Sequence, residues 1–568
     1  MANPLIPRFD ILEGYGKRTA MADAIAGTIL AILLVPQAMA YAQLAGLPPE
    51  AGLYAALVPP LLYVLFGTSP YVSVGPVALI SLVIAEAARG AGVEPIAAAA
   101  IVGIEAGVIL ACLGALQLGR LVNFISEPVL LGFTAAVAIL ICASQLPTLL
   151  GTDPDRAGNL PDALAAFWQV LPQWQPATAA IGITALILLL ALNRYAAPLA
   201  WKLGIHPPWR QALAKSLPLL VIVGCAVAAS MVPGQVPRVS TPPGGLPTLS
   251  LPELVPGLWL SLLPSAIAVA VVIFATATAV AKSLAGDDRS TLDTSREAVA
   301  LGLGNIGASL TGGYAVSASL SRSALVEDSG GRTPIAHVVG AALVLAVIVF
   351  FAPVLGFLPK TALAALVISA IFGLVKLREM RNVWDHDRIE GGLIAIAFLA
   401  TLIFGVELGL AIGALAGLAH FLWFSSLPRV TRIGTDDGGR SFRSVDREKV
   451  EVETLPQLII RIDRSVFFAN AAFVEDEVFK LLSWHDKVDC LIIDMRSVNS
   501  LDASGAAMMK RLTERLYDMK IAVRFAQTHQ PVIDRLDRLD PRKCAFHRTI
   551  PEAMEQCGAP LVDRIAPS

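Results

Sequence analysis

Charged residues are scarce in this chain. Asp, Glu, Lys and Arg make up 15% of its 568 residues, against about 25% in an ordinary soluble domain. The formal net charge of −2 gives no basic footprint, so nucleic acid is not an expected partner. Hydrophobic residues reach 55%, a share that excludes a disordered chain. The composition predicts a protein whose solvent is largely lipid.

Cysteine is also scarce, and its spacing indicates no site. Six scattered cysteines without a CxxC pair exclude a disulfide framework. We expect reduced, unreactive thiols at all six positions, Cys112, Cys142, Cys225, Cys490, Cys544 and Cys557. The histidines are isolated, and neither a Walker A sequence nor a nucleophile–base arrangement can be found. We therefore expect no enzyme and no bound metal or cofactor. A GxGxxG pattern at residues 302–307 has no preceding strand, so we interpret it as close helix packing.

The few charges are unevenly distributed. Nearly half of them fall in residues 433–568, which are less than a quarter of the chain. The long first part reads instead as apolar runs of membrane length, for which about 20 residues are needed. We predict about fourteen spans, near residues 22–44, 51–67, 76–88, 95–117, 128–146, 177–193, 213–232, 261–284, 297–311, 317–327, 335–352, 360–375, 389–405 and 407–424.

The loop charges predict the orientation. With the N-terminus inside, most loop Lys and Arg residues, including Arg8, Arg120 and Arg289, are cytoplasmic. The outer side keeps only Arg89, Arg156, Arg238 and Lys360. This positive-inside bias predicts a multi-pass protein of the inner (plasma) membrane with both termini in the cytoplasm. A secretory signal ending at residues 38–40 would explain only one of the apolar segments.

Two short, polar-interrupted segments occupy matching places in the two halves. They cover residues 71–81 and 314–323, and each is the third span of a half that has seven spans. Because seven is an odd number, the second half has the inverted orientation in the membrane. Interrupted helices in inverted repeats are typical of secondary transporters. Their N-termini would meet at mid-membrane, where free N–H groups bind anions. Pro76 would begin the first half-helix, and serines would cap the second.

Arg322 lies at the same predicted depth. An intramembrane arginine is costly and is a functional candidate by default. The alternative is an arginine that packs against a carboxylate or a helix C-terminus. Among the acids, we expect Asp23 to favour the N-terminus of the first helix, Glu86 to reach the outer interface and Glu407 to be structural.

Several of these residues resemble a known family. The stretches 35–42, 44–49 and 52–54 are similar to the first-helix signature of the SulP, or sulfate-permease-like, anion transporters. Gly75–Ala78 and Ser319–Ser323 are similar to the third- and tenth-helix motifs of that family, and 405–409 fits near its last two helices.

The resemblance implies a helical membrane fold like that of uracil permeases, in residues 1–432. Spans 1–4 and 8–11 would form a core, and spans 5–7 and 12–14 a gate. The anion would sit between helices 1, 3, 8 and 10, and we expect a homodimer surrounded by lipid. Carried over, the substrate-binding residues are Gln37, Tyr41, Val77, Ala78, Ser319, Leu320, Ser321 and Arg322.

One position departs from the family pattern. Many bacterial members have an acidic residue in helix 8, where this chain has Thr276. A hydroxyl cannot carry a proton through a cycle as a carboxyl can. Thr276 could still ligate an ion, and Glu105 in the fourth span is a second candidate for coupling to H⁺ or Na⁺. Glu105 could equally be a carboxyl held in packing.

The charged tail, residues 441–558, alternates strand and helix patterns. Its order and its Leu-Asp-Ala-Ser-Gly turn at 501–505 resemble a STAS domain, the usual cytoplasmic tail of SulP transporters. Stand-alone STAS proteins can be phosphorylated at the matching serine, here Ser504. The alternative is that Asp502 and Ser504 simply cap a helix. The stretch 534–543 reads as a solvated surface or a dimer or partner contact.

Together these features predict a secondary anion transporter with an elevator-type cycle and sulfate as its leading substrate. Bicarbonate or a C4-dicarboxylate, by transport or exchange, remains an alternative, because backbone dipoles hold any compact oxyanion. An anion channel would use the same half-helices. A membrane-anchored signalling protein would use its spans only to hold the tail.

Overall fold

The computed structural model describes residues 5–7, 15–119, 126–153, 157–202, 209–232, 234–285, 292–435, 441–445, 457–485, 487–538 and 544–557. Arg8, Arg120, Arg156 and Arg289 of the predicted loops lie outside these ranges, as do residues 539–543 of the charged stretch. The chain forms two compact units, residues 1–417 and 418–568.

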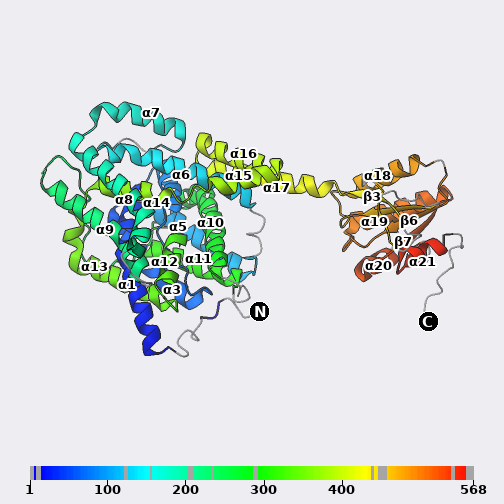
Figure 1. Cartoon of the computed structure of the whole chain (residues 1–568), viewed down its shortest axis with the longest axis horizontal. Coiled ribbons are helices and arrows are strands. Elements are labelled where there is room, and N and C mark those ends of the chain that lie inside the picture. The colour runs from blue at the N-terminus through cyan, green and yellow to red at the C-terminus, as the bar shows by residue number, and fades with distance from the viewer. Residues whose placement is uncertain are drawn as a thin grey trace. The chain divides into compact units, whose positions relative to one another are not determined.

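Each of the fourteen predicted spans coincides with a helix or a pair of helices (Figure 1). In chain order they are α1 (Lys17–Ala45), α2 (Pro49–Tyr54) with α3 (Val58–Phe66), α4 (Ala78–Gly90), α5 (Pro95–Ala115), α6 (Glu127–Leu149), α8 (Pro176–Lys202), α9 (Trp209–Ser230), α10 (Pro256–Leu284), α11 (Thr294–Leu310), α12 (Leu320–Asp328), α13 (Ile335–Leu355), α14 (Lys360–Ile371), α16 (Arg388–Phe404) and α17 (Val406–Ser426). Two amphipathic helices, α7 (Leu160–Val170) and α15 (Leu377–His386), and the turn η3 (Leu171–Gln173) join them.

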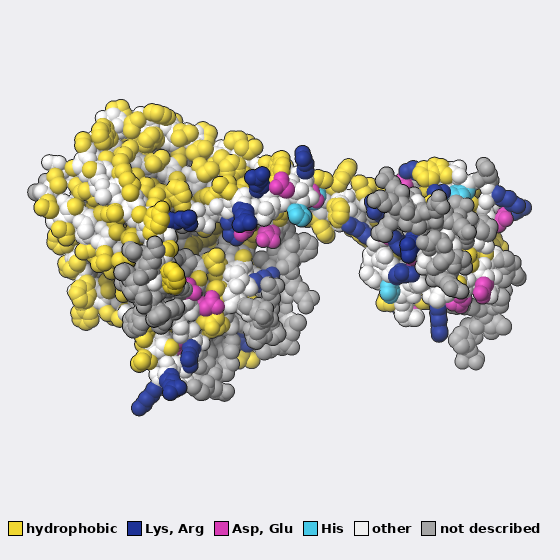
Figure 2. Space-filling view, viewed as in Figure 1, with side chains coloured by type: hydrophobic (Ala, Val, Ile, Leu, Met, Phe, Trp, Pro, Cys, Tyr) yellow, Lys and Arg dark blue, Asp and Glu magenta, His cyan; other side chains and the backbone are white. Residues whose placement is uncertain are grey.

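In the described part of the chain, eight helical segments, with α2 and α3 counted as one, are long and apolar enough to cross a membrane. Hydrophobic side chains gather densely over a large part of the described surface of the helical unit (Figure 2). Such a surface would be a liability in water and is what lipid requires. The sequence-based prediction of a polytopic helical membrane fold is therefore confirmed.

Two helices of the unit are too short to span a bilayer. α4 has 13 residues and α12 has 9. At 1.5 Å per residue they are roughly 20 and 14 Å long, against a hydrocarbon core of about 30 Å. Each follows a two-residue strand, β1 (Val74–Gly75) or β2 (Ser317–Ala318), so the same irregular element recurs in both halves.

Small residues bring α5 and α11 together. A Cβ added at Gly302 would lie 2.5 Å from the amide nitrogen of Ala111, and one at Gly107 would lie 2.7 Å from the carbonyl oxygen of Gly302. Neither position can hold a side chain without a shift of backbone. The glycine pattern at 302–307 therefore packs helices, as its sequence context predicted.

The second unit is an α/β layer with a six-stranded sheet in the order β4-β3-β5-β6-β7-β8. The strands β5, β6, β7 and β8 are parallel, and β3 pairs antiparallel with both β4 and β5. The strands are β3 (Val430–Gly434), β4 (Arg443–Ser444), β5 (Leu458–Ile462), β6 (Cys490–Asp494), β7 (Ala522–Ala526) and β8 (Ala545–His547). The helices are α18 (Ala471–Ser483), α19 (Ala503–Asp518), α20 (Gln530–Asp537) and α21 (Ile550–Glu555). The sheet thus begins upstream of residue 441.

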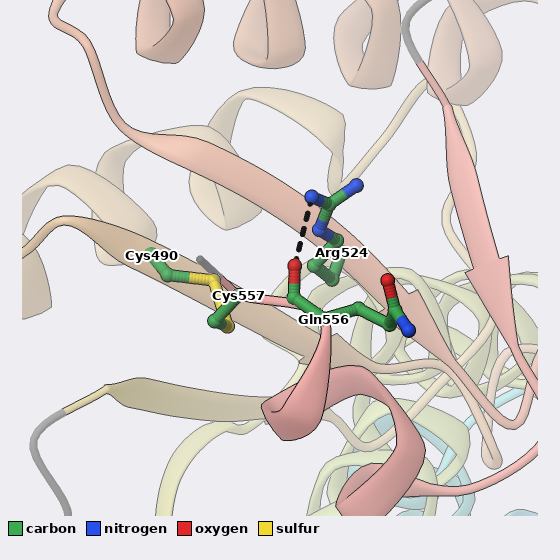
Figure 3. The surroundings of a disulfide bond; sticks show 4 residues. All are labelled: Cys490, Arg524, Gln556 and Cys557. Atoms are coloured by element: carbon green, nitrogen blue, oxygen red, sulfur yellow. Dashed lines mark hydrogen bonds between the residues drawn. A yellow bond between two sulfur atoms is a disulfide. The ribbon is translucent and has the colours of Figure 1, made fainter. Parts of the chain in front are cut away.

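Alternation along β6 sends side chains to two different cores. Leu491 and Ile493 pack with α18, α19 and α20, while Cys490 and Ile492 face α21. Cys490 forms a disulfide with Cys557, just after α21 (Figure 3). The expectation of six free thiols was therefore wrong for this pair. The two cysteines are 67 residues apart in sequence, and only the packing of α21 on the sheet brings their Cα atoms to 5.8 Å.

Candidate functional site

The two short strands cross antiparallel inside the helical unit. Val74 is opposite Ala318, and Gly75 is opposite Ser317. Two further bonds extend the crossing: the Ser319 amide donates to the Ser73 carbonyl over 3.1 Å, and the Ser73 amide donates to the Ser323 hydroxyl over 2.8 Å. Extended backbone at membrane depth must find hydrogen-bond partners for its polar groups within the protein. Here the two strands provide these partners to each other.

Both half-helices start from this crossing. α4 begins at Ala78 with Val77 as its N-cap, so Pro76 lies two residues before the helix and does not begin it, contrary to the sequence-based expectation. α12 begins at Leu320, and the Ser319 side chain accepts from the Arg322 amide over 3.5 Å, which makes Ser319 the expected cap. The first turns of both helices thus leave N–H groups near one point.

The α12 first turn has a buried and an exposed side. Arg322 and Ser323 are buried, whereas Ser321 is exposed and Leu320 is 48% exposed. On α4, Val77 is half-buried and Ala78 is buried. The hydroxyl of Ser321 is therefore the accessible donor of this turn.

Arg322 links the two half-helices. Its side chain is 1% exposed, and its Nη1 donates to the Pro76 carbonyl over 2.9 Å. Its Nε donates to the Ser73 hydroxyl over 3.4 Å. Its Nη2 has no hydrogen-bond partner, and no carboxylate forms an ion pair with it within the described residues. The partners of Arg322 are neutral, so a buried positive charge with one spare donor stands at the crossing.

The other candidate residues come from α1 and α10. Gln37 and Tyr41 are both 7% exposed, on the part of α1 that follows Pro36, and α1 packs against α4 and α12. The Thr276 hydroxyl of α10 lies 3.0 Å from the Ser317 hydroxyl on β2. Thr276 also donates to the Val272 carbonyl of its own helix over 2.7 Å. The predicted helices 1, 3, 8 and 10 therefore do meet around the crossing.

Sequence reasoning did not single out four polar residues that build the crossing. Ser73, Ser317 and Ser323 make the contacts given above, and the Tyr314 hydroxyl lies 2.9 Å from the Ser81 hydroxyl of α4. All four lie inside the two polar-interrupted segments. The density of hydroxyls there was visible in the sequence, but which hydroxyl faces which depends on strand register.

The structure corrects the prediction for one acid and adds a contact for another. Asp23 is completely buried, and its carboxylate accepts from the amides of Arg332 (2.7 Å) and Thr333 (3.1 Å) and from the Thr333 hydroxyl. It therefore stabilises the chain entering α13 instead of the N-terminus of its own helix. Glu86 is half-buried and accepts from the Val406 amide over 3.0 Å.

Two more acids have separate surroundings. Glu407 accepts from the Ser265 hydroxyl, which agrees with a structural role. Glu105 lies on α5, and its Oε2 is buried without a hydrogen-bond partner. None of the contacts found among the described residues joins Glu105 to the crossing.

The STAS-like turn has its own geometry. Asp502 caps α19 by accepting from the Gly505 amide over 2.7 Å, and it also accepts from the Phe468 amide over 2.8 Å. Ser504 is exposed in the first turn of α19, so it is not the cap. Asp494, which ends β6, is 1% exposed, and burial raises the pKa of its carboxyl although the Arg496 amide donates to it.

Opposed half-helices in repeated halves define a membrane protein of the transporter class. A model of the sulfate permease family matches residues 21–397, and a STAS domain model matches residues 448–553. The chain therefore belongs to the sulfate permease family and carries a C-terminal STAS domain.

Named relatives agree with this membership. The chain is 30% identical over 518 residues to "Sulfate transporter 4.1, chloroplastic" of Arabidopsis thaliana, covering 88% of this chain and 74% of the relative. It is 28% identical over 589 residues to "Solute carrier family 26 member 10" of Mus musculus, covering 96% and 84%. These relatives are transporters, consistent with the expectation that this chain is not an enzyme.

Solved structures show the same fold. A murine Solute Carrier 26 family member A9 anion transporter in the inward-facing state aligns with a TM-score of 0.88 at 19% identity, covering 97% of this chain and 94% of that one. The transmembrane domain of the cyanobacterial bicarbonate transporter BicA aligns with a TM-score of 0.59 at 20% identity, covering 71% and 98%.

Proposed function

We propose that this protein is a secondary active transporter that moves sulfate across the inner membrane. The observation that carries the proposal is the antiparallel crossing from which α4 and α12 both begin, with the spare Nη2 of Arg322 beside it. The first-turn amides, the Ser321 hydroxyl and the guanidinium would together hold a divalent oxyanion. Relatives named as sulfate transporters support sulfate as the substrate.

The cycle we propose is of the elevator type. The core would consist of α1 to α5 and α10 to α13, which hold the crossing, and the gate of α6 to α9 and α14 to α17. The anion would move with the core, because both half-helices and Arg322 belong to it. We further propose a homodimer embedded in lipid, with both termini in the cytoplasm.

Coupling to H⁺ or Na⁺ is a separate part of the proposal. Thr276 lies at the crossing and could bind a cation through its hydroxyl, but it cannot carry a proton. Glu105 is the carboxyl that could, since its Oε2 is buried and has no hydrogen-bond partner. If Glu105 carries the proton, E105Q flattens the pH dependence of uptake, and an unchanged pH profile rejects that role.

Reconstitution tests the whole proposal. Proteoliposomes containing the full chain should take up labelled sulfate with saturation and counterflow, and Arg322→Ala should lose most of this uptake. Arg378→Gln, which removes an exposed arginine from α15, is the matched control and should leave uptake unchanged. Competition by bicarbonate, fumarate and chloride ranks the anions. Unsaturable conductance in a planar bilayer would indicate a channel instead, and no transport of any anion would refute the proposal.

A further inference from the structure

The disulfide between Cys490 and Cys557 attaches α21 to the sheet of the second compact unit, here called the STAS unit. Cys490 lies on β6, and Cys557 is the second residue after α21 (Figure 3). Cys490 is 2% exposed, whereas Cys557 is half-buried. A thiol from solution can therefore approach the sulfur of Cys557, while α21 and the sheet shield that of Cys490.

The helix α21 is short and buries little of its own surface. It has six residues, of which Ile550 and Ala553 are buried. Arg524 of β7 holds the end of the helix, because its Nη2 donates to the Gln556 carbonyl over 3.0 Å (Figure 3). An isolated helix of this length is not stable in water. The position of α21 on the sheet therefore depends strongly on the disulfide.

The sheet beneath α21 is apolar. Ile550 and Ala553 belong to one hydrophobic cluster with side chains from four neighbouring strands, namely Ile433 of β3, Ile459 of β5, Ile492 of β6 and Ala526 of β7. Each of these strand residues is at most 4% exposed. Departure of α21 would expose part of this cluster to water. An exposed apolar patch of this kind is typical of an interaction surface.

The proposed orientation places the STAS unit in the cytoplasm, where thiols are kept reduced. Disulfides in that compartment are usually transient and serve catalysis or redox sensing. We propose that Cys490 and Cys557 form a redox switch: the oxidised pair holds α21 on the sheet, and reduction by a protein dithiol releases it. This inference rests on the cytoplasmic placement of the tail in the proposed function and does not depend on the substrate.

The reaction is a thiol–disulfide exchange. A thiolate of the dithiol attacks the sulfur of Cys557, the bond between Cys557 and Cys490 breaks, and Cys490 leaves as a thiolate that takes up a proton. The second thiol of the reductant then displaces Cys557, and the reductant becomes a disulfide. In total, the reductant loses two electrons and two protons, and the two protein sulfurs gain them.

Thiol labelling of the native full-length protein tests the switch. Protein in phosphatidylcholine nanodiscs would be treated with reduced thioredoxin and then with iodoacetamide, and mass spectrometry would report the labelling of each cysteine. We expect Cys490 and Cys557 to be labelled at rates within about tenfold of each other, because release of α21 exposes Cys490. Labelling of Cys557 alone would show that α21 stays on the sheet, and labelling of neither would show that the native bond resists reduction. Either result would overturn the switch.

Hydrogen exchange gives a second readout, which does not depend on thiol reactivity. In α21, the Ala553 amide donates to the Thr549 carbonyl over 3.2 Å, and the Gln556 amide donates to the Glu552 carbonyl over 3.3 Å. Reduction of the wild-type protein should speed the exchange of these two amides at least about tenfold, whereas α19 on the other face of the sheet should remain protected. Equal exchange of α21 in the oxidised and reduced protein would overturn the switch.

Two variants control for other effects of the reductant. C490S/C557S should exchange in α21 like the reduced wild-type protein, with or without reductant. C544S removes a buried thiol of the STAS unit that lies outside the disulfide, and it should respond to reductant as the wild-type protein does. Loss of the response in C544S, or a response that persists in C490S/C557S, would contradict the assignment to this pair.

Whole cells separate this inference from the proposed orientation. In cells oxidised with diamide, a membrane-impermeant reductant should reduce the pair only after the cells are permeabilised. Reduction in intact cells would refute the cytoplasmic placement of the tail, and the switch with it. A pair that thioredoxin cannot reduce in nanodiscs would overturn the switch alone.

Discussion

Replacement of Arg322 separates a binding role from a packing role. The guanidinium is buried, uses Nη1 and Nε on neutral partners and keeps Nη2 spare, so it can offer a bound anion a charge-assisted hydrogen bond. Such bonds contribute about 1.5–3 kcal/mol, which corresponds to about a 10- to 150-fold change in affinity. Arg322→Ala should therefore weaken sulfate binding by that factor. Arg322→Lys should recover part of it, because it keeps the charge but not the fork.

The control for this experiment removes a partner of Arg322 and leaves its charge. Ser73→Ala deletes the weak 3.4 Å contact to Nε, and we expect a loss of about 0.5 kcal/mol, or about twofold in affinity. The assay is equilibrium binding of labelled sulfate to purified protein, with size-exclusion profiles and Tm measured for each variant. A well-folded Arg322→Ala protein that binds sulfate with wild-type affinity would refute the role of this arginine.

Three further predictions concern other parts of the chain. Gly405 has φ 90°, and an added Cβ would lie 2.5 Å from the Glu86 carboxylate. Gly405→Ala should therefore lower Tm by several degrees, whereas E86Q, whose side chain can still accept from the backbone, should not. An unchanged Tm for Gly405→Ala would contradict this. Reduction of the Cys490–Cys557 disulfide should destabilise the STAS unit by about 2–4 kcal/mol. Hydrogen exchange in β6 should then become faster, and equal exchange with and without reductant would contradict this prediction. Burial raises the pKa of Asp494, so the STAS unit should lose stability as pH rises above about 4, where the unfolded carboxyl ionises first. D494N should flatten this dependence in β6 protection factors corrected for intrinsic exchange, and an identical pH slope would argue against it.

The sequence alone was sufficient to predict the membrane helices and the positions of the two half-helices. Apolar runs set the spans, and the interrupted segments 71–81 and 314–323 marked where regular helix fails. Both signals are local, which is why a single sequence carries them. The cap at Ser319 was likewise predictable, because a serine before a short helix is a local preference.

What the sequence could not supply is long-range. The pairing of Gly75 with Ser317 joins residues 242 positions apart, and nothing in either segment sets that register. The contact between Asp23 and Thr333 forms only when α1 packs against the chain before α13. From the sequence alone, Asp23 was therefore assigned to its own helix. The disulfide was missed for the same reason, since strand and helix must pack before the two sulfurs meet.

The most direct test of the account is to locate a bound oxyanion in an experimental structure. Selenate mimics sulfate and scatters anomalously, so crystals soaked in it would reveal its position in an anomalous map. The account predicts selenate within hydrogen-bond distance of the first-turn amides of α4 and α12 and of Arg322 Nη2. Ordered selenate elsewhere, with none at the crossing in a protein that transports sulfate, would contradict the central claim.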